Sequence, residues 1–221
     1  MPSSGLKLLL LLTTLAMSSM NGRLPAEEGD SKKLVEQVIG AVGGEDKLLK
    51  FMRYRERVLI TSTPAAKPAA DEKGNRTSTI ELGGRMWVGN GPREKDKVRV
   101  LMWAWSLRIL SAPDAKISVI PDATVGGKQA LGLKVTEAIK EPIELYFDPE
   151  IKLLIAIDYT DTRHMVSEWK KTEDGLAYAS HVVGYRFTDR TKKLLNEKQW
   201  YQTDILELTA LSELPANLLK K

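Results

Sequence analysis

The two histidines, His164 and His181, are the side chains in this sequence best suited to acid–base or metal chemistry. His164 lies near Asp158, Asp161 and Glu168, and an extended strand would place His164 and Glu168 on one face. A catalytic zinc site takes three protein ligands, and the sequence has no H-E-x-x-H motif. We therefore expect no metal site here and no resident cofactor.

His181 could form a Ser–His–Asp arrangement with Ser180 or Ser167, but neither serine lies in a G-x-S-x-G motif. The absence of cysteine excludes a cysteine nucleophile, a thiolate zinc site, a disulfide framework and lipidation on an N-terminal cysteine. We expect no catalytic residue and a protein that is not an enzyme.

The basic residues give two interpretations. Arg93, Lys95, Lys97 and Arg99 could meet anionic lipid headgroups, or they could form the solvated side of a helix. Over the whole chain, Lys and Arg exceed Asp and Glu by 33 to 29, for a net charge of +4. An excess this small is not typical of a nucleic-acid-binding protein. We expect no nucleic-acid partner.

The N-terminus has the pattern of a signal peptide over residues 1–18. A short positive segment ends at Lys7, about ten mostly apolar residues follow, and Ala16 and Ser18 occupy the −3 and −1 positions of a cleavage site. An uncleaved anchor is the alternative, but the apolar stretch is about half of the roughly 20 residues that a spanning helix needs. We expect an exported, periplasmic protein with a linker over residues 19–30 and one domain over residues 31–221.

The first half of that domain predicts two helices and a hairpin. Ser31 is a good N-cap for a helix that ends at Gly43–Gly44, and residues 76–82 and 85–88 predict a hairpin. Between Pro92 and Leu110, one helical stripe carries Val98, Leu101, Met102, Trp105 and Ile109, which favours a helix, although residues 98–102 could also form a strand. Residues 64–73 predict an Ala/Pro-rich loop.

The second half predicts strands joined by connections too short for parallel crossovers. The expected strands cover residues 115–120, 130–138, 143–147, 151–158, 163–171, 177–187 and 194–208, with a short helix or turn after residue 211. The fold class is therefore mainly β within α+β, as an antiparallel meander.

Strands near the middle of this meander are apolar on both faces. Residues 151–157 place Ile151, Leu153, Ile155 and Ile157 on one face, with Leu154 and Ala156 on the other. A sheet with one solvated face would alternate apolar and polar residues. Either helices cover one face and the other flanks a hydrophobic cavity, or both faces are packed and there is no cavity.

Several segments resemble the LolA-like proteins, which are relatives of the outer-membrane lipoprotein carrier and its receptor. Within that family, the resemblance is strongest to the branch common in planctomycete-type bacteria. The segments are AVGGEDKL (41–48), VGGKQALGLKV (125–135), LYFDP (145–149), LLI (153–155) and ELPANL (213–218). The resemblance spans about residues 31–219. It implies an incomplete antiparallel β-barrel wrapped around a few helices, with a hydrophobic concavity for acyl chains.

Together these observations predict an exported carrier that holds a lipid or acyl chain, free or attached to a protein, and that meets other envelope proteins. The side chains expected to line its cavity are Trp87, Trp103, Trp105, Tyr146, Leu154 and Trp169. In the alternative interpretation the tryptophans are buried packing groups, the core is filled, and the protein is an envelope scaffold that acts through its surface.

Overall fold

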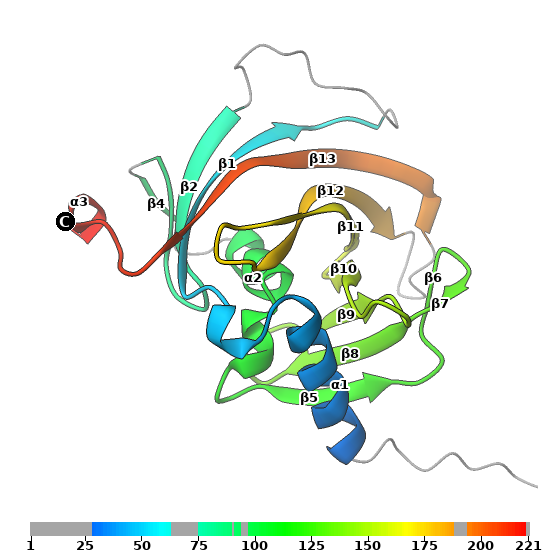
Figure 1. The fold of residues 1–221 in the computed structure, drawn as a ribbon. Helices are drawn as coiled ribbons and strands as arrows, with labels where there is room; N and C mark the ends of the chain where they lie inside the picture. The colour runs from blue at the N-terminus through cyan, green and yellow to red at the C-terminus, as the bar shows by residue number, and fades with distance from the viewer. Residues whose placement is uncertain (1–27, 63–74, 90, 94–96, 188–193, 220–221) are drawn as a thin grey trace, which may run out of the picture.

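The protein is one large antiparallel sheet that curves around helix α2 (Lys97–Trp105) without closing on itself (Figure 1). The predicted fold class, an incomplete antiparallel barrel around a few helices, is confirmed. The computed structural model describes residues 28–62, 75–89, 91–93, 97–187 and 194–219. The predicted leader, the linker up to residue 27 and the Ala/Pro-rich loop lie outside these residues.

The sheet has eleven strands in the order β4-β3-β2-β1-β13-β12-β11-β10-β9-β8-β5. Their bounds are β1 (Phe51–Leu59), β2 (Asn75–Glu81), β3 (Met86–Val88), β4 (Gly91–Arg93), β5 (Lys116–Ile120), β8 (Leu131–Thr136), β9 (Ile143–Phe147), β10 (Leu154–Tyr159), β11 (Thr162–Lys171), β12 (Ala177–Phe187) and β13 (Leu194–Leu211). Strands β6 (Thr124–Val125) and β7 (Lys128–Gln129) form a separate hairpin. The helices are α1 (Glu28–Ala41), α2 and α3 (Ala216–Leu219), with 3-10 turns η1 (Glu45–Lys47) and η2 (Arg108–Ser111).

The predicted meander is confirmed, because neighbouring strands in the sheet are mostly neighbours in the chain as well. The hairpin across Gly83–Gly84 pairs β2 with β3, as expected. The main exception is the pairing of β1 with β13, which joins the two ends of the domain. This seam brings the N-terminal strands onto the rest of the sheet and completes its curvature.

Helix α1 buries one face against the concave side of the sheet, near β5 (Figure 1). Its buried side chains follow helical spacing: Leu34, Val38 and Ile39, with Val42 just beyond the helix. The helix begins at Glu28, so the prediction that Ser31 is its N-cap was wrong. It ends as predicted, at Gly43 and Gly44, whose φ angles of 123° and 105° favour glycine.

Helix α2 is held in the concavity by the turn between β2 and β3. The Arg99 side chain donates a hydrogen bond to the carbonyl oxygen of Gly84. A Cβ on Gly83, whose φ is 85°, would lie 3.0 Å from the ring of Trp103, so that ring rests on the glycine. The prediction of a helix rather than a strand was correct for residues 97–105, but Pro92 lies in β4, before the helix.

A second apolar cluster lies on the convex face, under the β6–β7 hairpin. Its buried members are Ala123, Val125, Ala130, Tyr146 and Ala156. The prediction that both faces of the sheet are apolar was therefore correct. The outer face is covered by the β6–β7 hairpin, whereas one of the two expectations was that helices would cover a face.

A buried ion pair lies beside this outer cluster. Arg163 Nε and Nη2 donate to the two carboxylate oxygens of Asp158 at 2.7 and 2.8 Å, and the Asp158 side chain is only 2% exposed. The guanidinium also lies 5.1 Å from the ring centre of Tyr146. Burial, followed by the charge of Asp158, raises the pKa of the Tyr146 hydroxyl.

A bulge in β10 changes which side chains share a face. The pairing of β10 with β9 shifts between Leu154 and Ala156. Leu154 and Ile157 consequently both belong to the main core, whereas Ile155 packs against the outer cluster. The expected grouping of Ile155 with Ile157 was wrong, because strict alternation does not continue through a bulge.

Candidate functional site

A cavity of about 330 Å³ lies between helix α2 and the concave face of the sheet. Most of its wall is apolar and comes from α2 and from strands β1, β10, β11, β12 and β13. The apolar lining residues are Val58, Ile60, Val98, Leu101, Met102, Trp105, Ile157, Tyr159, Val166, Val182, Trp200, Tyr201 and Ile205. This volume is within the range of small-molecule sites in proteins.

One face of α2 forms the helical side of the cavity. Val98, Leu101, Met102 and Trp105 follow i, i+3, i+4, i+7 spacing, which places them on one stripe. They are four of the five residues of the predicted stripe. The fifth, Ile109, lies beyond the helix in η2 and is fully buried.

A buried polar group interrupts the wall on β1, β2 and β13. Arg76 Nε donates to Glu56 Oε1 at 2.6 Å, and the Thr203 hydroxyl donates to Glu56 Oε2 at 3.0 Å. Glu56 is 5% exposed, so its carboxylate depends on these two partners in place of water. All three residues line the cavity.

A second polar pair crosses three strands on the same wall. His164 on β11 and Tyr201 on β13 share a hydrogen bond between Nδ1 and the phenol oxygen, and both are buried. Gly184 on β12 is the cross-strand partner of both. A Cβ on Gly184 would lie 1.9 Å from Cε1 of Tyr201, so the ring reaches His164 only because the position between them is glycine.

We predict that His164 makes the fold sensitive to acid. Burial lowers the pKa of His164 to about 4, from 6.5 for an exposed histidine. As pH falls through the window between these values, the unfolded state takes up the proton first, so stability is lost. The loss should be about 2 kcal/mol by pH 5. Urea unfolding at pH 7.5 and pH 5 measures it, and His164→Gln should remove that part of the loss; an equal loss in both proteins would contradict the assignment.

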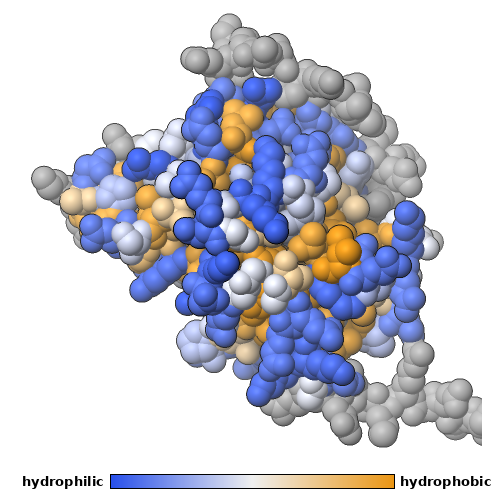
Figure 2. All heavy atoms as spheres, viewed as in Figure 1, coloured by the Kyte–Doolittle hydropathy of each residue, from blue (hydrophilic) through white to orange (hydrophobic). Residues whose placement is uncertain are grey.

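The cavity opens where β1 ends, β2 begins and β10 turns into β11. Ile60, which lines the opening, is 69% exposed. Lys97, Thr160, Asp161 and Arg186 also contribute to this part of the lining. Burial opposes ionisation of Asp161, but hydrogen bonds from Thr160, its own backbone and Thr162, together with nearby Lys97, lower its pKa overall. In Figure 2 hydrophilic side chains cover most of the visible surface, with apolar atoms between them.

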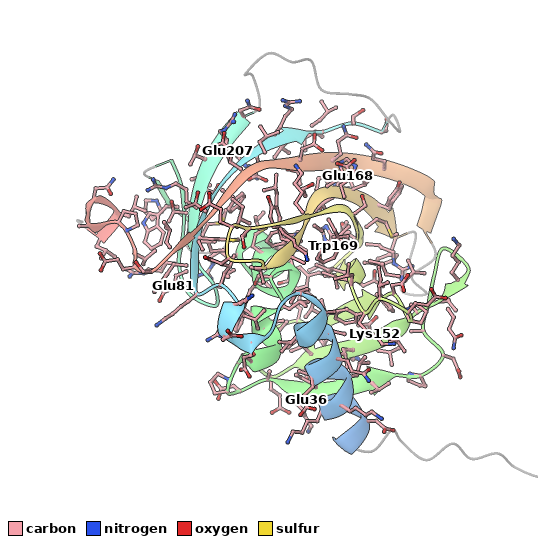
Figure 3. All side chains as sticks on the ribbon, in the orientation of Figure 1. Glu36, Glu81, Lys152, Glu168, Trp169 and Glu207 are labelled. Carbon is pink, nitrogen blue, oxygen red and sulfur yellow. The ribbon has the colours of Figure 1, made fainter. Side chains whose placement is uncertain are left out.

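Of the predicted lining residues, the structure places Trp105 in the wall of this cavity. Trp103 faces the opposite side of α2, against Gly83. Trp87 is buried on β3, where the Arg85 guanidinium lies 5.2 Å from its ring. Trp169 is half-buried on β11, beside Glu168, and packs against the main core (Figure 3).

The two other predicted residues lie on opposite faces of the sheet. Leu154 is fully buried in the main core. Tyr146 belongs to the outer cluster, and its hydroxyl donates to Glu144 at 2.8 Å. The structure therefore does not bring the six predicted side chains together around one cavity.

The two histidines lie in different environments, because His164 lines the cavity and His181 does not. No group of three His, Asp or Glu side chains close enough to hold a metal occurs in the described part of the chain. His181 Nδ1 lies 2.7 Å from Asp204 Oδ1, and Ser167 is its partner on β11. No hydrogen bond between Ser167 and His181 is found among the described residues. Ser167, His181 and Asp204 lie side by side across three strands on the outer face, and none of them lines the cavity. Ser180 donates to the carbonyl oxygen of Glu168.

Sequence reasoning missed the polar groups of the cavity wall. Glu56 occupies an inward position in a strand where Met52, Tyr54 and Val58 alternate, and a charge at such a position is a sign of a buried pair. Gly184 is an isolated glycine in a strand, which marks close approach by another group. Both signals are visible in the sequence. The sequence does not show which residues pair with Glu56, because Arg76 and Thr203 lie 20 and 147 positions away from it.

The fold and the cavity define a class of protein in which a helix and an open antiparallel sheet enclose an apolar chamber. Among solved structures, the chain is similar to a candidate outer membrane lipoprotein-sorting protein domain from Vibrio parahaemolyticus, at 8% identity and a TM-score of 0.46, covering 86% of this chain and 95% of that one. It is also similar to a DUF1329 family protein from Desulfovibrio piger, at 10% identity and a TM-score of 0.47, covering 86% and 97%.

A further similarity is to the MucA/MucB complex of Pseudomonas aeruginosa, at 10% identity and a TM-score of 0.25, covering 87% of this chain and 61% of that one. The Vibrio parahaemolyticus structure is named as a lipoprotein-sorting domain, and the sequence resemblance was to relatives of the outer-membrane lipoprotein carrier. No protein-family model and no curated protein matches the chain. Within the described residues, no helix has both the length and the apolar character required to span a bilayer.

Proposed function

We propose that this protein binds the acyl chain of a lipid or of an acylated protein in the cavity between α2 and the sheet, and shields it from water in the cell envelope. The observation that carries the proposal is the cavity itself, about 330 Å³ with a mostly apolar wall. Burial of apolar area, about 25 cal/mol per Å², would drive binding without a cofactor. Trp105 is the predicted lining residue that we propose contacts the chain.

The cavity favours this function over the scaffold with a filled core. A scaffold would be expected to close the space between α2 and the strands with side chains, since protein interiors contain few voids larger than a water molecule. The exported location is part of the proposal and rests on the leader predicted over residues 1–18. The N-terminal residue of protein recovered from an envelope fraction tests it, with Ser19 expected.

Leu101→Glu tests the binding site. Leu101 lines the cavity and is half-buried, so a carboxylate there should weaken uptake of a fluorescent fatty acid at least tenfold, because the bound chain would desolvate the charge. Val100→Glu is the matched control: it is the preceding residue of the same helix, it is also half-buried, and it does not line the cavity. A fluorescence titration measures both, and circular dichroism verifies the folds. Equal affinities for the two variants would contradict the proposed site.

A further inference from the structure

Cationic side chains from three separate elements gather at the open end of the cavity. Arg76 lies at the beginning of β2, Lys97 begins α2, and Arg186 is near the end of β12, and all three contribute to the lining. The strand ends that carry Arg76 and Arg186 belong to the same end of the sheet, through the pairing of β1 with β2 and β13 and of β13 with β12. The apolar chamber therefore has a basic mouth.

Arg76 is oriented in advance for an anion. Its Nε is fixed by the buried Glu56 carboxylate at 2.6 Å, and that carboxylate is held in turn by Thr203. Within the described part of the chain, no hydrogen bond from the two terminal nitrogens of the guanidinium is found beside the one from Nε. The side chain is 31% exposed. A guanidinium held on one edge by a carboxylate, with donors left on the other edge, is suited to binding a planar oxyanion.

Arg186, unlike Arg76, has no acidic partner among the described residues. Its guanidinium lies over the Trp200 ring, 4.8 Å from the ring centre, and both residues line the cavity. The acidic side chains of the lining are Glu56, which Arg76 and Thr203 engage, and Asp161, which lies near Lys97. Among the described residues, the lining thus holds three cationic and two acidic side chains, which is a net positive charge.

We infer that the ligand of this cavity is a single-chain amphiphile with a carboxylate headgroup, a fatty acid. The inference rests on the proposed function, the binding of an acyl chain in this cavity. The chain lies along the apolar wall towards Trp105, and the carboxylate stays at the mouth, in the field of Arg76, Lys97 and Arg186. A volume of about 330 Å³ is at the lower end of the range for ligand pockets, which favours one chain over the two of a phospholipid.

Displacement of a neutral apolar dye, N-phenylnaphthylamine, from the full exported chain tests the inference. The competitors are dodecanoic acid and its methyl ester, which have the same chain but differ in charge. At pH 8 we expect the acid to bind about tenfold more tightly than the ester. Arg186→Gln should reduce the affinity for the acid about fivefold and leave the affinity for the ester unchanged.

Arg85→Gln is the matched control. Arg85 also lies over a tryptophan, 5.2 Å from the ring centre of Trp87, but neither residue lines the cavity. This variant should bind both competitors like the wild type.

The outcomes separate the two proposals. If acid and ester bind equally well, or if Arg186→Gln weakens both alike, the carboxylate inference is overturned while the acyl-chain function stands. If lysophosphatidic acid binds more tightly than dodecanoic acid, the headgroup is a phosphate and the inference of a fatty acid is wrong. If none of these compounds displaces the dye, the proposed function fails together with the inference.

Discussion

Asp158→Ala is expected to lower the free energy of unfolding by about 3–5 kcal/mol, the usual cost of leaving one partner of a buried ion pair alone. Asp158 is 2% exposed and accepts two hydrogen bonds from Arg163, whose own side chain is 11% exposed. Without the carboxylate, the guanidinium would lie against Tyr146 and Phe187 with its principal counter-ion missing. Urea unfolding at pH 7.5 measures the loss.

The matched control removes both charges. Asp158→Leu combined with Arg163→Met replaces the pair with apolar groups of similar size, and such replacements are often close to neutral. The double variant should therefore be clearly more stable than Asp158→Ala. A loss below about 1 kcal/mol for Asp158→Ala would mean that water compensates the guanidinium, and that the pair contributes no more than a solvent-exposed ion pair does.

Gly184→Ala is expected to destabilise the fold by about 2–3 kcal/mol, although alanine is usually accepted in a strand more readily than glycine. The new Cβ would lie 1.9 Å from Cε1 and 2.3 Å from Cδ1 of Tyr201. The ring would have to leave its place over β12 and would lose its hydrogen bond to His164. The backbone of Gly184 is not in the left-handed region, so the effect isolates the steric contact.

Two further variants make this prediction specific. Gly91→Ala, in the edge strand β4, places a Cβ no closer than 3.6 Å to any neighbour and should change stability by less than about 0.5 kcal/mol. In a Tyr201→Ser background, Gly184→Ala should lose most of its penalty, because the ring that it meets is absent. A penalty that persists in this double-mutant cycle would place the conflict elsewhere.

The strand pattern could be predicted from the sequence because each hairpin is local. Turn residues such as Gly83–Gly84 and Asp148–Pro149 separate apolar segments, and short connections require antiparallel neighbours. Residues 143–147 and 177–187 form strands with the predicted bounds. The stripe on residues 98–105 was likewise visible, since helical periodicity depends only on nearby residues.

The cavity wall could not be predicted in the same way, because its members meet only through long-range pairing. Trp105 was expected in the lining, whereas His164 and Tyr201 come together through the register of three strands. The opposite orientations of Trp103 and Trp105 are the exception, because residues two positions apart in a helix point to nearly opposite sides, as the predicted helix already implies. The bulge at Leu154 and Ala156 is a property of the paired strands and shifts the faces that simple alternation assigns.

The seam between β1 and β13 also has a kinetic consequence. Arg55 and Glu207 form an ion pair across it although they lie 152 positions apart in the sequence. Hairpins along the meander can form as soon as their two strands exist, but this seam has to wait for the end of the chain and for closure of a long loop. Until β13 arrives, β1 and β12 both present open edges, so the interval before this last pairing is when the chain is most exposed to misassociation.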